Sequence, residues 1–127
     1  FDVVIALEVL EHLADPITAL AALMRRARPG GEIVVSLPNE WHLLRRLALL
    51  LGAEPLGGAE DPHLRHFGLR SARRLFAAAG AAVRAERAVG IIPPWCRAAD
   101  AAGSALARLA PRLFGLSFLF LVLKEER

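Results

Sequence analysis

Two short runs of mostly apolar, branched residues constrain the fold of this chain more than any other feature. The first run is Phe1–Leu7 and the second is Glu32–Leu37. Near-continuous apolar runs of this length are typical of strands that are buried on both faces of a parallel sheet. The segment between them is long enough for a crossover helix, so we expect the two strands to lie parallel with a right-handed connection.

The crossover segment carries its own helix signals. Asp15-Pro16 predicts the helix start, because Asp is a good N-cap and Pro suits the first helical turn. Pro29-Gly30-Gly31 predicts the turn that follows the helix. Apolar residues recur between these signals at helical spacing: Ile17, Leu20, Ala21 and Met24.

The rest of the chain continues the alternation of helices and strands, which places it in the α/β class. A leucine stripe at residues 43–51 predicts a helix that ends at Gly52, and Gly52–Pro62 is expected to be a loop. Further helices are expected at Leu69–Ala79 and Arg97–Ala110, and further strands at Ala82–Val89 and Leu116–Leu123. No internal repeat or linker divides the 127 residues, so we expect one domain.

Composition excludes several classes of protein. Hydrophobic residues make up 55% of the chain, which favours a packed core over disorder. The chain opens with Phe1 inside an apolar run, and we therefore interpret it as part of a longer protein. The single cysteine, Cys96, rules out an internal disulfide or a cysteine metal cluster and favours a cytoplasmic location.

The positive charges of the chain are placed as expected for the solvent-exposed faces of helices. A net charge of +3 with a pI near 10.4 is compatible with a nucleic-acid partner. The arginine pairs, however, each fall on an expected amphipathic helix, and no aromatic residues are interleaved with them, so we expect no nucleic-acid partner. The apolar stretch Leu113–Leu123 is shorter than the roughly 20 residues of a membrane span. We expect neither a transmembrane segment nor a secretory signal.

Three stretches, in order, resemble one known family. They are Phe1–Pro16 (FDVVIALEVLEHLADP), Arg28–Asn39 (RPGGEIVVSLPN) and His63–Phe67 (HLRHF), the last followed by a helix and Ala79-Gly80. Together they resemble the class I S-adenosylmethionine (SAM) dependent methyltransferases of types 11 and 12, especially those similar to the ubiquinone-biosynthesis O-methyltransferases. The first two also resemble the methionine-biosynthesis-associated methyltransferases. The resemblance covers most of residues 1–90.

The resemblance implies a Rossmann-like sheet of seven strands, mostly parallel with an antiparallel last strand, and SAM across the carboxyl ends of the strands. Phe1–Leu7 and Glu32–Leu37 match the fourth and fifth strands of that sheet, and the two later strands match the sixth and seventh. The first three strands, with the glycine-rich turn and the acidic ribose-binding residue, have no counterpart. Residues 1–127 are thus expected to be the C-terminal portion of one methyltransferase domain, whose partner is its missing N-terminal half.

The end of the first strand is where the family contacts its cofactor. The resemblance implies that Ala6, Leu7 and Glu8 form the retained SAM-binding edge, largely through their backbone. The alternative for Leu7 is a position in the hydrophobic core.

Glu8, Glu11 and His12 have the spacing 0, 3 and 4, which puts them on one side of a helical turn. Two carboxylates and an imidazole suit a divalent cation such as Mg²⁺, and the resemblance implies a metal site of the pattern acid-x-x-Glu-His. Such a cation would lower the pKa of a substrate hydroxyl. Three alternatives remain open: Glu11 and His12 brace the following helix, His12 is a catalytic general base, or His12 is a hydrogen-bonded structural residue.

Loops after the second strand and before the third helix supply candidate substrate-binding residues. Asn39 is expected to hydrogen-bond a substrate, and Trp41 to form an apolar wall. His63 and His66 are expected near the substrate mouth. The alternatives are packing of the next helix for Trp41, and solvent exposure or helix capping for the histidines.

The expected function is methyl transfer from SAM to an oxygen, nitrogen or carbon atom of a small molecule, by in-line displacement. One alternative is a non-catalytic fragment or interaction domain with a sheet edge that needs covering. A nicotinamide-binding domain would need Gly-x-Gly-x-x-Gly after a strand, which the sequence lacks. A nucleic-acid methyltransferase usually carries Asn/Asp-Pro-Pro-aromatic where this chain has Glu8–Glu11.

Overall fold

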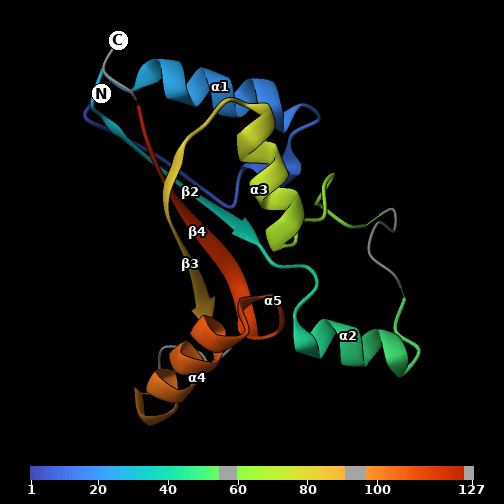
Figure 1. The fold of residues 1–127 in the computed structure, drawn as a ribbon. Coiled ribbons are helices and arrows are strands. Elements are labelled where there is room, and N and C mark those ends of the chain that lie inside the picture. The colour runs from blue at the N-terminus through green and yellow to red at the C-terminus, as the bar shows by residue number, and fades with distance from the viewer. Residues whose placement is uncertain (55–59, 91–96, 125–127) are drawn as a thin grey trace.

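The computed structural model describes residues 1–54, 60–90 and 97–124, with residues 97–101 described by their backbone alone. Four strands form one mixed sheet that helices flank (Figure 1). The elements run in the order β1 (Val3–Leu7), the 3₁₀ turn η1 (Leu10–His12), α1 (Pro16–Arg26), β2 (Glu32–Pro38), α2 (Leu43–Leu50), α3 (Leu69–Ala78), β3 (Val83–Gly90), α4 (Arg97–Leu109), α5 (Pro111–Phe114) and β4 (Gly115–Leu123).

The strand order is β1-β2-β4-β3. β1 and β2 are parallel, with Val3 opposite Glu32 and Leu7 opposite Ser36, which confirms the crossover prediction. β4 lies between β2 and β3 and runs antiparallel to both. The antiparallel last strand implied by the family resemblance is therefore confirmed.

The crossover follows the predicted signals. The side chain of Asp15 accepts a hydrogen bond from the amide of Thr18 at 3.1 Å and so caps α1. After the helix, Gly30 adopts a φ of 70°, which glycine tolerates best. A Cβ on Gly31 would lie 2.9 Å from the carbonyl oxygen of Arg28, so the turn also needs a residue without a side chain there.

The core lies on one face of β2 and β4, where α1 and α3 cover the sheet (Figure 1). Alternate residues of both strands point into it: Ile33, Val35, Leu37, Phe118, Phe120 and Val122. From α3, Phe76 packs on Phe120 with ring centroids 4.5 Å apart, and Leu20 of α1 is fully buried. The amphipathic pattern predicted for α1 and α3 therefore faces the sheet as expected.

One prediction about burial is wrong, and one predicted helix forms without burying a residue. Residues 3–7 form a strand, but it is not buried on both faces: Val3, Ile5 and Leu7 are exposed, Ile5 at 63%. The reason is that β1 pairs with β2 alone in the described part of the sheet, and no described helix covers this face. Likewise α2 forms from the leucine stripe but buries no residue, because it extends away from the sheet (Figure 1).

The remaining elements follow the predicted ranges closely. β3, α3 and α4 form where they were expected, and β4 begins at Gly115, one residue before the expected start. Cys96 and part of the loop expected at Gly52–Pro62 lie outside the described residues. No helix in the described ranges has both the length and the apolar character that crossing a membrane requires.

Candidate functional site

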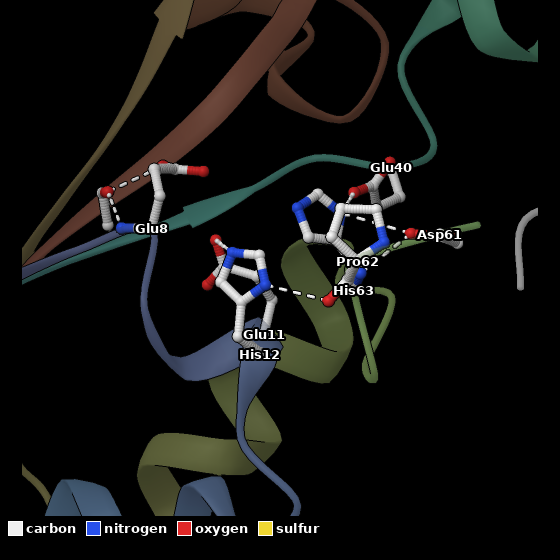
Figure 2. Close-up of polar contacts among 8 residues, drawn as sticks. Glu8, Glu11, His12, Glu40, Asp61, Pro62 and His63 are labelled. Atoms are coloured by element: carbon white, nitrogen blue, oxygen red, sulfur yellow. Dashed lines mark hydrogen bonds and ion pairs between the residues drawn. The ribbon is translucent and has the colours of Figure 1, made fainter. Parts of the chain in front are cut away.

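The carboxyl end of β1 has a fixed and unusual shape. Glu8 has a φ of 51°, a left-handed conformation that no other non-glycine residue adopts in the described ranges. Its amide donates to Oγ of Ser36 at 3.0 Å, and that hydroxyl donates to Oε1 of Glu8 at 2.7 Å (Figure 2). A left-handed non-glycine residue costs about 1 kcal/mol or more and is held only by its surroundings. The two bonds to Ser36 thus lock the backbone at the end of β1.

The predicted cofactor edge lies at this locked turn. Ala6 is buried against the core side of the sheet, while Leu7 is half exposed. Within the described residues, Leu7 therefore does not belong to the hydrophobic core. Ligands of open α/β sheets bind outside the carboxyl ends of parallel strands, which is where Leu7 and Glu8 lie.

Glu11, in η1, is a buried carboxylate without a hydrogen-bond partner. Its side chain is fully buried, and neither carboxylate oxygen has a hydrogen bond. Burial raises the pKa of Glu11, and the negative charge of Glu8 adds to the shift. Buried polar groups are almost always satisfied, so this carboxylate either carries a proton or faces a cation.

His12 presents one free nitrogen to Glu11. Its Nδ1 lies 2.9 Å from the carbonyl oxygen of Pro62 (Figure 2). A carbonyl can only accept, so Nδ1 carries a proton, and in the neutral ring Nε2 then has the lone pair. Nε2 lies 3.8 Å from Oε1 of Glu11. The ring is therefore oriented to act as a base or as a metal ligand at Nε2.

A second cluster of acids and histidines borders the first. Nδ1 of His63 lies 2.6 Å from Oε1 of Glu40 and 4.0 Å from Oδ1 of Asp61. Nε2 of His66 lies 3.5 Å from Oδ2 of Asp61. The rings of His63 and His12 are in contact, with centroids 4.9 Å apart (Figure 2). Three imidazoles and three carboxylates thus meet near the ends of β1 and β2.

Backbone hydrogen bonds bring these segments together. The amide of Glu40, just after β2, donates to the carbonyl of Phe67 at 2.9 Å. The amide of Arg65 donates to the carbonyl of Glu11 at 3.0 Å, and its guanidinium reaches the carbonyl of Ala14 at 2.7 Å. The loop before α3 is consequently held against both η1 and the end of β2.

The predicted metal ligands are only partly brought together. Donor atoms of Glu11 and His12 converge with His63, and all of them lie within 4.8 Å of one another. Glu8 is not in this group, since its carboxylate is bound to Ser36. The helical turn begins only at Leu10, so the spacing of Glu8 to Glu11 does not place both on one face.

The sequence reasoning did not single out Glu40 or Asp61. A usable signal was present, since one acid, Asp61, and two imidazoles, His63 and His66, fall within six residues. Glu40 directly follows a strand that ends at the ligand-binding edge. Both residues lie in loops, where no helical or strand periodicity predicts which side chains will be neighbours. Their contact with the histidines could therefore not be predicted from spacing alone.

Asn39 is committed to internal hydrogen bonds. It is 2% exposed, and its Nδ2 donates to the carbonyls of Gly115 and Arg112 at 2.7 and 3.2 Å. Its Oδ1 accepts from the amide of Trp41 at 3.2 Å. These bonds tie the loop after β2 to the start of β4, so Asn39 shapes the site rather than facing a ligand.

Trp41 lines a small open cleft of about 260 Å³ between the loop after β2 and the start of α3. Its indole lies against Gly68, where a Cβ would come within 2.9 Å of the ring. Four arginines share the lining: Arg46, Arg70, Arg74 and Arg112. Together with the amino-terminal end of α3, they favour negatively charged groups in this cleft.

Comparisons with known proteins agree with the fold. Residues 1–86 match the family model described as a methyltransferase domain, and the strand order places the fold among the class I SAM-dependent methyltransferases. The chain therefore belongs to the methyltransferase-domain family. This confirms the family resemblance inferred from the three sequence stretches.

Similar curated proteins are ubiquinone biosynthesis O-methyltransferases. The one from Methylococcus capsulatus is 45% identical over 56 residues, which cover 44% of this chain and 23% of that protein. The one from Aeromonas salmonicida is 39% identical over 56 residues, again with 44% and 23% covered. The chain thus matches about a quarter of the length of these relatives.

Solved structures extend the likeness over nearly the whole chain. A SAM-dependent methyltransferase from Thermotoga maritima aligns with a TM-score of 0.61 at 16% identity, covering 98% of this chain and 56% of that one. The [4+2]-cyclase SpnF aligns with a TM-score of 0.60 at 17% identity, covering 100% and 50%. At these identities the likeness establishes the fold and not the reaction.

Proposed function

We propose that these residues form the acceptor side of a SAM-dependent methyltransferase that acts on a small molecule as part of a longer enzyme. The observation that carries the proposal is the locked turn at Glu8 beside the oriented base His12, at the sheet edge where the fold binds ligands. The family match over residues 1–86 supports the same activity. Its setting is inferred to be cytoplasmic from the single cysteine.

The acceptor atom is inferred to be an oxygen. The similar curated proteins are named as O-methyltransferases. A hydroxyl must lose its proton as it attacks the methyl group of SAM, and Nε2 of His12 carries a lone pair that can accept this proton. The backbone of Ala6, Leu7 and Glu8 then holds the cofactor so that the acceptor and the methyl group lie in line.

The acceptor is inferred to carry negative charge. The cleft beside Trp41 is lined by four arginines, and its mouth adjoins the loop of Glu40. Positive charge there would attract and orient an acidic acceptor. His63 and His66 lie on the loop that borders this entrance, so we retain them, with Trp41, as proposed acceptor-side residues.

A divalent cation such as Mg²⁺ is a proposed further component of the site. The buried, unpartnered carboxylate of Glu11 and the free Nε2 of His12 fit a cation. Glu8 would join them only if its side chain turned away from Ser36. When bound, the cation would lower the pKa of an acceptor hydroxyl.

The exposed face of β1 supports the inference that a preceding half of the same domain completes the site. Val3, Ile5 and Leu7 form an uncovered apolar row, and β1 has a free edge in the described sheet. Free apolar edges of this kind are normally paired or covered. The solved relatives, of which this chain covers 50–62%, have further chain that can do so.

Titration calorimetry with S-adenosylhomocysteine tests the proposal. The parent protein that contains these residues is expected to bind it with one site per chain, and the 127-residue chain alone to bind it weakly or not at all. His12→Gln is expected to retain this binding while turnover falls about 100-fold or more, because a general base contributes about 10²–10⁴-fold. A folded parent protein that binds no S-adenosylhomocysteine would overturn the proposal.

A further inference from the structure

We infer that Glu40, His63 and His66 bind a first-row divalent transition metal such as Zn²⁺. One donor atom from each side chain lies within 4.8 Å of the other two. Glu40 follows β2, whereas the two histidines belong to the loop before α3, so the site joins two segments that are distant in sequence. It shares His63 with the neighbouring group of Glu11 and His12, but its other two ligands are different, and it does not depend on the proposed methyl transfer.

The donor set selects the type of ion. Two imidazole nitrogens and one carboxylate are ligands typical of zinc and of its first-row neighbours. Mg²⁺ prefers an octahedron of oxygen atoms and keeps several waters. The site is therefore expected to discriminate against Mg²⁺, in contrast to a site built mainly on carboxylates.

The distances are compatible with metal coordination after small side-chain movements. Zinc–nitrogen and zinc–oxygen bonds of about 2.0–2.1 Å in a tetrahedron separate the donor atoms by about 3.3 Å. Nδ1 of His63 and Oε1 of Glu40 lie 2.6 Å apart, which is closer than that, and the widest separation in the group is no more than 4.8 Å. Shifts of about 1 Å suffice. All three side chains are partly buried, between 14% and 27% exposed.

The surroundings resemble the outer shell of a metal site. The carboxylate of Asp61 accepts a hydrogen bond from the amide of His63 at 2.9 Å, and its other oxygen lies 3.5 Å from Nε2 of His66. Carboxylates that orient metal-bound imidazoles in this way are usual. In addition, Nδ1 of His66 is buried and has no hydrogen-bond partner. A buried polar atom without a partner is unfavourable, and binding a metal ion would satisfy it.

A bound ion would hold the loop before α3, which carries His63 and His66, against the end of β2. One backbone hydrogen bond, from Glu40 to Phe67, joins the end of β2 to the loop at this point. A metal held by Glu40, His63 and His66 would add three strong links across the same gap. It would leave one coordination position open for water or another ligand, as sites with three protein ligands do.

Metal titration of the purified parent protein, after dialysis against a chelator, tests the inference. Calorimetry with Zn²⁺ is expected to show one ion per chain, and excess Mg²⁺ is expected not to displace it. His66→Gln and Glu40→Gln should each weaken Zn²⁺ binding by about tenfold or more. His12→Gln is the matched control, because it removes a neighbouring imidazole outside the site and should leave Zn²⁺ affinity unchanged.

The outcomes separate this site from the one around Glu11. A loss with His12→Gln as large as with His66→Gln would place the ion at Glu11 and His12 and overturn the inference. Absence of saturable Zn²⁺ binding, or equal affinity in wild type, His66→Gln and Glu40→Gln, would overturn it as well. Thermal melting verifies that each variant is folded, and if one is not, the other of the two ligand variants decides the result.

Discussion

At the scale of the residue, the burial of Glu11 predicts how the stability of the protein depends on pH. Burial raises its pKa in the folded state above 4.5, the ordinary value, which applies in the unfolded chain. Folding therefore favours the protonated form, and stability is lost as the pH rises from the unfolded value through the folded one. Glu11→Gln removes this loss, so the free energy of unfolding of the variant should exceed that of wild type increasingly between about pH 4 and neutrality.

Urea denaturation of wild type and Glu11→Gln at several pH values, with divalent cations removed, measures this difference. Glu40→Gln serves as the comparison, because it also removes a carboxylate from the site, but one whose side chain is 14% exposed rather than fully buried. A difference between wild type and Glu11→Gln that does not change with pH would contradict the prediction. If a cation that binds Glu11 is present, wild type should instead be more stable than Glu11→Gln, since the cation stabilises the ionised form of Glu11.

A second prediction at the residue scale concerns Ser36. Its hydroxyl accepts from the amide of Glu8 and donates to the carboxylate of the same residue, and it is buried. Ser36→Ala should lower the free energy of unfolding by about 1–3 kcal/mol, because both hydrogen bonds of the hydroxyl to Glu8 are lost and the Glu8 amide keeps only the backbone carbonyl of Ser36, at 3.4 Å. It should also weaken S-adenosylhomocysteine binding by the parent protein, since the turn at the cofactor edge is released.

The control for Ser36→Ala is Ser117→Ala, a serine of β4 away from the end of β1. Chemical denaturation and calorimetry on both variants give the comparison. If Ser36→Ala binds S-adenosylhomocysteine as tightly as Ser117→Ala does, the locked turn has no part in the cofactor edge.

At the scale of the element, α2 and α3 offer a direct contrast. Both are amphipathic helices, yet Phe76 of α3 is buried against Phe120, and Leu50 of α2 is 82% exposed. Phe76→Ala should cost about 3–5 kcal/mol of stability, whereas Leu50→Ala should change it by less than about 0.5 kcal/mol. Denaturation of the two variants measures the difference. A large loss with Leu50→Ala would mean that α2 packs on something the described residues do not include.

The contrast between α2 and α3 also shows which properties of a helix can be predicted from the sequence. Hydrophobic periodicity and caps predict that residues 43–51 form a helix, but they do not say which surface covers its leucines. The same holds for β1, where an apolar run predicts the strand and not its exposure. Burial depends on neighbours from elsewhere in the chain or beyond it, whereas helix and strand formation is largely local.

The site was predictable to a similar extent. Glu11, His12, His63 and His66 follow from motif and resemblance. The structure brings donor groups of Glu11 and His12 close to His63, and a donor group of His66 close to His63 as well. Glu8 shows why spacing alone misleads, because its left-handed backbone turns it away from the helical turn. Glu40 enters the site through one backbone hydrogen bond to Phe67, which no sequence pattern records.

At the scale of the whole molecule, Ile5 tests the proposed covering of β1. In the 127-residue chain Ile5→Lys should change stability by less than about 0.5 kcal/mol, because the side chain is exposed. In the parent protein the same substitution should cost about 2 kcal/mol or more, because an unpaired charge would be buried. Val89→Lys, at an exposed position of β3, is the control for charge alone. Equal effects of Ile5→Lys in the two proteins would show that this face stays open.

The position of β4 has a consequence for the order in which the molecule can form. β3 pairs with β4 and with no other described strand, and β2 takes the same β4 on its free side. A chain emerging from the ribosome can therefore form the β1–β2 crossover early, but β3 has no place in the sheet until residues 115–123 have been made. Pairing over such long sequence separations is slow, and until β4 has been made one edge of β2 and the edge of β3 that β4 covers stay unpaired. The last strand thus acts as the closing step of folding, and a ribosome that stalls before it would release a protein with an open sheet.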